Sequence, residues 1–435
     1  MLSKIEKISE VVSGKKTGHT WLNDFRAQAL DQYRKTGFPT ANQELWRFST
    51  VQQLEHIPFQ PDFSAPDTTD KKYAENFLKT LKEKNFYSSG HRFVFLNGHF
   101  LPELSNVNAK SSGYSFNVID ADELLHHPDL QQILSAPFSR PGAFKFLNDA
   151  LFQKLVSVRV AKNAIVERPI EILFLSSKKT PLLYSPKILL TLEDGAQASV
   201  VQHYRADSDA QNMTNAVAQI CLGKNAVLYH IKYQQESWQG YHTAQTEVAQ
   251  PTDSQFFSSV VSTGAKFSRE DLNVVLNGAG AACTLNGIYY LQGNQQADHH
   301  TLIDHASGHG SSRELYKGVM DGTAQAIFDG KVIVRPQAQK TDAIQINKNL
   351  LLTKGARINT KPDLEIFAND VKCKHGATIG QLQKEALFYL QSRGIALAEA
   401  RQILIRAFVS EIADAIAQEP LRLQMKNFLE QLGYV

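Results

Sequence analysis

The stretch Lys187-Ile-Leu-Leu-Thr-Leu-Glu-Asp-Gly-Ala196 holds the two signals on which the fold depends. Its side chains Ile188, Leu190 and Leu192 point one way while their neighbours point the other, the period of two expected of a half-buried strand. The Asp-Gly-Ala that follows marks a corner, because glycine supplies a positive φ and the small alanine lets stacked coils approach closely. Repetition of this strand-and-corner unit would build a layered β structure.

The unit recurs in degenerate form from about residue 165 to residue 379. Related corners stand at 194–196, 223–226, 263–265, 278–281, 321–324, 354–356 and 375–377, at irregular intervals of roughly 16 to 42 residues. Short β-prone runs lie between turn residues with no intervening helix: 170–175, 187–192, 199–204, 216–222, 227–233, 256–262, 271–276, 284–291, 326–334 and 364–371. This pattern favours a β-solenoid or a β-sandwich, with the solenoid slightly ahead.

The composition is that of an ordinary globular protein of the cytoplasm. Its 435 residues exceed the usual size of a single core, which predicts two or three domains. A net charge of +3, with basic and acidic residues interspersed, gives no indication of nucleic-acid binding. Three scattered cysteines exclude a disulfide framework and fit a reducing compartment. No apolar run approaches the roughly 18 residues of a membrane span, so we expect no membrane contact.

Helical patterns flank the β-rich part, which suggests a mostly helical region 1–155, a core 156–380 and a helical region 381–435. In the first region, residues 93–96 followed by Asn97-Gly98 predict a strand and a hairpin turn, and 143–156 predict a helix. In the last region, Ser392-Arg393-Gly394 ends one predicted helix and Pro420 opens another. The apolar stripe expected between them contains Ile403, Leu404, Ala407, Phe408 and Ile412. These helices either pack on the β body or offer a face to a partner.

A thiol and an imidazole stand two residues apart in Val371-Lys-Cys-Lys-His-Gly-Ala-Thr-Ile-Gly380. If this stretch is extended, Cys373 and His375 face the same way, and Gly376 and Gly380 predict a turn that presents them. Such a pair can bind iron, copper or zinc, or the thiol can be activated for attack. Two ligands do not complete a site, so others would come from elsewhere or from a second subunit. The alternative is a buried small residue beside a surface histidine.

His299, His300 and His305, with His309 and two aspartates among them, form the densest group of potential metal ligands. Their spacing matches no closed zinc pattern, and the nearby glycines predict a loop. Solvated or hydrogen-bonded loop histidines are therefore the stronger interpretation, and a metal site is the weaker one.

The stretch 371–395 resembles the SufB/SufD family of iron–sulfur cluster assembly proteins. After the residues quoted above it continues Gln-Leu, then Glu-Ala-Leu-Phe-Tyr-Leu-Gln-Ser-Arg-Gly-Ile. Upstream segments agree with the family: Gly37-Phe-Pro-Thr40 with Glu44-Leu-Trp-Arg47, then Arg313-Glu-Leu-Tyr-Lys-Gly318 and Asp363-Leu-Glu-Ile366. The resemblance runs through essentially the whole chain. Its length and its His-Gly-Ala-Thr element look like those of the SufD-type members.

The resemblance implies a non-catalytic scaffold subunit, mainly β, with a right-handed parallel β-helix between N-terminal and C-terminal helical regions. It implies a SufB-like paralogue whose β-helix end abuts this one, and a SufC-like ABC ATPase that docks on the C-terminal helices. The motif match makes His375 an interface ligand and Cys373 a secondary thiol. Iron acquisition and transient cluster formation would occur there, with no stably bound cofactor. We expect partner contacts at Arg393, Gly394, Ile395 and Phe408.

Two other functions stay open at this point. A β-solenoid enzyme acting on a sugar or another small substrate would need a groove with convergent acids, for which Glu270-Asp271, Asp321 and Asp329 are candidates. A homodimeric structural protein would bind zinc through the histidine group. Self-association of the chain in the absence of its paralogue is also left open.

Overall fold

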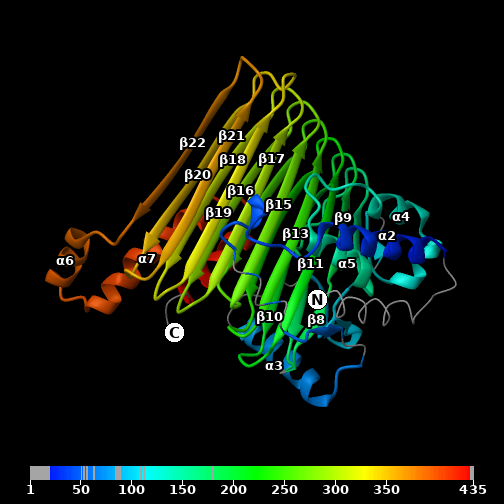
Figure 1. Ribbon diagram of the computed structural model, residues 1–435, viewed down its shortest axis with the longest axis horizontal. Coiled ribbons are helices and arrows are strands. Elements are labelled where there is room, and N and C mark those ends of the chain that lie inside the picture. The colour runs from blue at the N-terminus through cyan, green and yellow to red at the C-terminus, as the bar shows by residue number, and fades with distance from the viewer. Residues whose placement is uncertain are drawn as a thin grey trace.

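Alternating strands and small-residue corners wind this chain into a β-solenoid of about 8 turns with helices at both ends. The fold is seen in a computed structural model that describes residues 20–431 apart from 50, 52–53, 55–56, 62–63, 84–89, 108–109, 112 and 179. The strands lie side by side in two facing sheets, here called sheet A and sheet B (Figure 1). Successive core strands alternate between the two sheets, so each turn contributes one strand to each sheet. The predicted mainly-β fold with a β-solenoid core and helical ends is confirmed.

Sheet A has the order β21-β19-β17-β15-β13-β11-β9-β6-β5-β4, with β8 beside β11 and β1 beside β8. Its strands are β1 (Gln60–Pro61), β4 (Lys110–Ser111), β5 (Tyr114–Asp120), β6 (Lys154–Val160), β8 (Leu182–Tyr184), β9 (Lys187–Leu192), β11 (Asn212–Leu222), β13 (Tyr241–Gln250), β15 (Phe267–Leu276), β17 (Gln296–His305), β19 (Gln325–Val334) and β21 (Arg357–Ile366).

Sheet B has the order β22-β20-β18-β16-β14-β12-β10-β7-β2-β3. Its strands are β2 (His91–Leu96), β3 (His99–Phe100), β7 (Ile170–Ser176), β10 (Gln197–Ala206), β12 (Val227–Gln235), β14 (Gln255–Ser262), β16 (Ala282–Leu291), β18 (Ser311–Met320), β20 (Asp342–Leu351) and β22 (Lys372–Gly380). From β7 and β9 onward, neighbouring core strands in each sheet pair in parallel.

The solenoid has a more regular period than its corners suggest. Tyr241 pairs with Phe267, and Gln325 pairs with Arg357, so one turn takes between 26 and 32 residues. The corner spacing is irregular because corners occur at both ends of a turn: 223–226 joins β11 to β12, whereas 263–265 joins β14 to β15. Gly195 has a φ of +69°, and a side chain at Gly278 would lie 1.9 Å from the backbone of the previous turn. Small residues therefore occupy the corners for both predicted reasons, the positive φ and the close approach of neighbouring turns.

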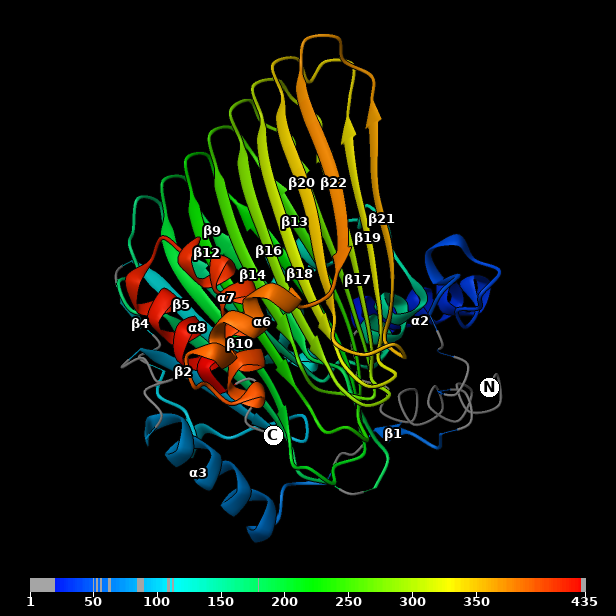
Figure 2. The ribbon, with the colours of Figure 1, turned by 90° about the vertical axis from the view of Figure 1, so that its left-hand side faces the viewer.

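Helices cover the outer faces of both sheets. Sheet A is covered by α2 (Thr20–Thr36), η1 (Glu44–Trp46), η4 (Ala121–His126), α4 (Pro128–Leu134) and α5 (Ala143–Leu151). Sheet B is covered by α3 (Thr68–Glu83), α7 (Leu397–Asp414) and α8 (Glu419–Gln431), of which α7 and α8 lie across its strands in Figure 2. The short η3 (Pro102–Leu104) precedes β4, and α6 (Lys384–Ser392) follows β22. The hairpin turn predicted at Asn97-Gly98 joins β2 to β3, and both of its residues have positive φ.

Several predicted bounds differ from the structure. The helix expected over 143–156 ends at Leu151, and the β-branched residues that follow enter β6. The strand expected over 364–371 ends at Ile366, because 367–371 form the corner before β22. The corner expected at 375–377 is wrong, since these residues lie inside β22. Gly376 has no positive φ, and Gly380 ends the strand, so neither glycine forms the predicted turn.

Candidate functional site at the open end of the solenoid

The last turn of the solenoid leaves two strand edges unpaired among the described residues. Strand β22 pairs with β20 alone, and β21 pairs with β19 alone. Figure 1 shows β22 as the outermost strand, at the end of the solenoid opposite α2 and α5. An unpaired edge exposes a row of backbone N–H and C=O groups that can pair with another chain. This end is where Cys373 and His375 lie.

Cys373 and His375 occupy alternate positions of β22 and therefore face the same way, as predicted. Cys373 is partly buried and packs against the core between the sheets, whereas His375 is exposed. Burial raises the pKa of the Cys373 thiol, and nearby Asp342 raises it further, against a backbone hydrogen bond from Ala343 that lowers it. In the isolated chain Cys373 is therefore a thiol, and a metal ion would have to displace its proton.

A column of polar side chains leads from the interior to His375. In the parallel register Glu314 of β18 stands beside Gln345 of β20, which stands beside His375 of β22. Gln345 donates from Nε2 to Glu314 Oε2 at 2.7 Å, and both side chains are buried. Burial raises the pKa of Glu314 to about 7, although hydrogen bonds from Thr301 and Gln345 oppose the shift. Sequence reasoning missed both residues, because Glu314 stands inside the family-like stretch Arg313–Gly318 and Gln345 belongs to no motif.

The three weaker histidine candidates do not form one site. They lie in strand β17 and are at most 5% exposed, so the predicted loop is wrong. Alternation sends His299 inward, where its ring stacks on Tyr289 at 5.2 Å, and sends His300 outward. His305 lies within 2.9 Å of the Ser312 hydroxyl at the far end of the strand. No group of three potential ligands that could hold a metal ion occurs among the described residues.

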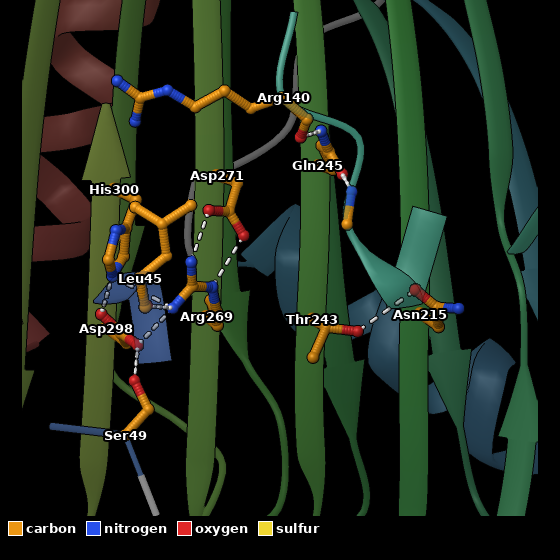
Figure 3. A network of polar contacts seen from close by, with 11 residues as sticks. Leu45, Ser49, Arg140, Asn215, Thr243, Gln245, Arg269, Asp271, Asp298 and His300 are labelled. Carbon is orange, nitrogen blue, oxygen red and sulfur yellow. Dashed lines mark hydrogen bonds and ion pairs between the residues drawn. The ribbon is translucent and has the colours of Figure 1, made fainter. Parts of the chain in front are cut away.

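His300 belongs instead to a polar network that fastens the N-terminal segment to sheet A (Figure 3). Arg269 makes ion pairs of 2.8 Å with Asp271 and Asp298, and its guanidinium lies 3.8 Å above the Trp46 ring. It also donates to the Leu45 carbonyl at 2.8 Å. Asp298 is completely buried, and it additionally accepts a hydrogen bond from Ser49. This network gives His300 and Asp298 a structural function.

The acids considered for a sugar-cleaving site do not converge. Glu270 points inward and pairs with Lys232, whereas Asp271 points outward and pairs with Arg269. Asp329 lies on the outer face near Lys361, and Asp321 accepts a hydrogen bond from a corner backbone N–H. Paired catalytic carboxylates must flank one bond at a defined separation, which these positions do not provide.

The C-terminal helices both pack on the body and leave apolar surface exposed. The buried face of α7 contains Ile405, Val409 and Ile412, which pack on sheet B. It is displaced by about one residue from the apolar stripe predicted from Ile403 and Leu404. Phe408 is partly buried, with Lys317 Nζ 4.8 Å from its ring centroid.

Helix α6 buries none of its residues, and its Phe388 and Tyr389 are 74% and 58% exposed. Arg393 and Gly394 end this helix, Gly394 with a φ of +84°. A groove of about 320 Å³ between the end of β22 and α6–α7 is lined by Ile379, Leu404 and Phe408, among others.

Fold and site together define a class of protein: a β-solenoid with a cysteine and a histidine on one face of a terminal strand whose outer edge is unpaired among the described residues. The residues that could bind a metal there, Cys373 and His375, need partners that the described part of the chain does not supply. No described helix is long and apolar enough to cross a membrane.

Comparison with known proteins identifies the family. Residues 174–408 match the family model described as the SUF system FeS cluster assembly SufBD core domain, and residues 9–172 match that of the SufBD protein N-terminal region. An iron–sulfur cluster assembly SufBD family protein of Synechocystis sp. is 34% identical, over 97% of this chain and 93% of that protein. The iron–sulfur cluster assembly protein SufD of Escherichia coli is 30% identical, over 92% and 90%. The chloroplastic protein ABCI7 of Arabidopsis thaliana is 28% identical, over 99% and 90%.

The chain therefore belongs to the SufB/SufD family of iron–sulfur cluster assembly proteins and is a homologue of SufD.

Proposed function

We propose that this protein is the SufD-type scaffold subunit of a cytoplasmic SUF assembly complex and that it joins a SufB-like paralogue through the open end of its solenoid. The observation that supports this best is the coincidence of two features in one turn. The strand with the sulfur–nitrogen ligand pair is also the strand whose edge has no partner among the described residues. A second β-solenoid placed against that edge would satisfy the backbone and bring further ligands to the pair.

The pair would serve iron acquisition and transient cluster formation at this junction. Iron–sulfur clusters take thiolates, and imidazole replaces thiolate in some of them. Two ligands, one of them a thiol with a raised pKa, bind a metal ion weakly, so assembly with the paralogue would control loading and release. No stably bound cofactor is proposed for the chain on its own.

A SufC-like ABC ATPase would dock on the C-terminal helices. Exposed aromatic residues on α6 and the apolar groove beside β22 provide a surface that a partner could cover. Arg393, Gly394 and Ile395 lie at the end of α6, and Phe408 lies in the groove, so ATP-driven movement of the helices would reach β22 directly. ATP hydrolysis would belong to the partner, and this chain would be non-catalytic.

The substitution His375→Ala tests the ligand assignment. Because His375 is exposed on an edge strand, the variant should fold and co-purify with its partners while the maturation of cluster enzymes in cells falls by at least about tenfold, as for loss of a ligand. The strain must lack a redundant assembly pathway. The matched control His126→Ala removes an exposed histidine at the opposite end of the molecule and should have no effect. Normal maturation with His375→Ala would remove this residue from the site.

A further inference from the structure

The buried carboxamide of Gln345 stands directly behind the exposed ligand candidate His375. The two residues are paired in the parallel register of β20 and β22. Strands in a sheet lie about 4.8 Å apart, so side chains in register on one face stack within hydrogen-bonding reach of one another. Gln345 is 0% exposed, whereas the imidazole beside it is open to the junction.

The orientation of the Gln345 amide is determined by its interior neighbours. Its Nε2 donates to Glu314 Oε2 at 2.7 Å, and above the raised pKa of Glu314, where the test below is made, the ionised carboxylate only accepts hydrogen bonds. Across the lumen, Gly330 of β19 leaves the space that the amide fills, since a Cβ there would lie 2.4 Å from Nε2. These contacts turn Oε1 away from Glu314.

Oε1 of Gln345 is buried in this orientation and has no hydrogen-bond partner among the described residues. An unsatisfied buried acceptor destabilises the folded state, so such an atom calls for an explanation. The next side chain in the column belongs to His375, which does not donate to this oxygen in the structure but whose exposed ring carries an N–H that a side-chain rotation would bring toward it.

We propose that Gln345 is a positioning residue for His375: its Oε1 accepts the hydrogen bond of one imidazole N–H and thereby leaves the other ring nitrogen free to face the junction. A histidine that binds a metal commonly donates from its second nitrogen to a fixed acceptor, which sets the tautomer and the ring orientation. The inference rests on the proposed ligand function of His375. It adds that the ligand is prepared from inside the solenoid, before a partner arrives.

The test is nitrogen NMR of the full chain with ¹⁵N-labelled histidine, at a pH where the imidazoles are neutral. The His375 signals are assigned by their loss in His375→Gln. In the wild type we expect His375 to show one tautomer. In Gln345→Met, which keeps the length of the side chain and removes the acceptor, the minor tautomer should rise several-fold.

The control variant is Asn349→Leu, which removes another inward amide from β20, opposite Ile379 rather than His375. It should leave the His375 tautomer unchanged. Mixed tautomers in the wild type, or a tautomer ratio in Gln345→Met equal to that of the wild type, would overturn the proposal. If Gln345→Met does not fold, the wild-type spectrum and the variant Gly330→Ala replace it in the test. The added methyl group on β19 pushes the Gln345 amide out of place, so the minor His375 tautomer should rise in this variant as well.

This measurement is made on the isolated chain and does not depend on cluster formation. If the proposed function is wrong, cluster enzymes will mature normally in His375→Ala, while His375 of the wild-type protein still shows a single tautomer. Failure of the positioning proposal would appear as a mixed tautomer while His375→Ala still abolishes maturation.

Discussion

Ionisable side chains inside the solenoid should make the stability of this protein depend on pH. Burial lowers the pKa of His299 to about 3 and raises that of Glu314 to about 7, so both side chains are neutral when the solution is mildly acidic. Lys232 and Glu270 form an ion pair, and His242 Nδ1 lies 2.7 Å from Glu236 Oε2, although burial lowers the pKa of His242. A β-solenoid can bury such groups because each turn supplies partners from the turn beside it.

Glu314→Gln should remove a pH-dependent cost to folding. The folded-state pKa of Glu314 lies above the ordinary value of 4.5, so the folded state binds the proton more tightly. Wild-type stability should therefore fall as pH rises from about 4.5 to about 7, by up to about 3 kcal/mol. Urea unfolding at pH 5 and pH 8 should show that the variant gains stability relative to the wild type at the higher pH. Parallel stability profiles would contradict the burial of this carboxyl group.

Arg269→Met should destabilise the protein by about 3–5 kcal/mol, because it leaves the completely buried Asp298 without its guanidinium partner. The segment around Trp46 should also become sensitive to proteases, since Arg269 holds it by a hydrogen bond and by the ring contact. Arg159→Met is the control. It breaks an exposed ion pair with Glu193 and should cost less than about 1 kcal/mol. Equal losses for the two variants would show that burial is not the cause.

At the scale of elements, strands with apolar residues at alternate positions could be predicted from the sequence, whereas strands with polar residues at those positions could not. Strand β9 has an apolar inner face and was predicted from its period of two. Strands β13, β17, β18 and β20 were missed, because their inner faces carry His, Thr, Glu, Gln and Asn that resemble loop composition. The polarity of these strands is satisfied by neighbouring turns, which a single stretch of sequence does not reveal. The same effect hid Gln345 and Glu314, whereas Cys373 and His375 were visible as a local pair.

Helix α6 allows a test of ATPase docking that leaves the core intact. Phe388→Asp places a charge on the most exposed aromatic residue of the helix and should reduce co-purification of the ATPase at least about tenfold, as for an interface anchor. The melting temperature should not change, because α6 buries none of its residues. Leu125→Asp alters a side chain that is 45% exposed on η4, at the other end of the molecule, and should retain the ATPase. Retention by both variants would place the docking surface elsewhere.

At the scale of the whole molecule, the open end of the solenoid should control pairing with the paralogue. Ala377→Pro removes a backbone N–H from β22 and bends the edge, so co-purification of the paralogue should be lost. The isolated variant should still fold, since β22 has only one neighbouring strand to disturb within the described chain. Ala377→Val favours a strand at the same position and should preserve pairing. If Ala377→Pro binds the paralogue as well as the wild type does in size-exclusion chromatography, the edge of β22 is not the pairing surface.

Stacked turns also make local order depend on position along the axis. Each internal turn is held from two sides, whereas the turn that contains β21 and β22 is held from one, so it should open and close more often than any turn behind it. A second solenoid docked there would convert a terminal turn into an internal one and suppress this fraying. Assembly would then do more than bring missing ligands: it would make rigid the strand that carries the first two.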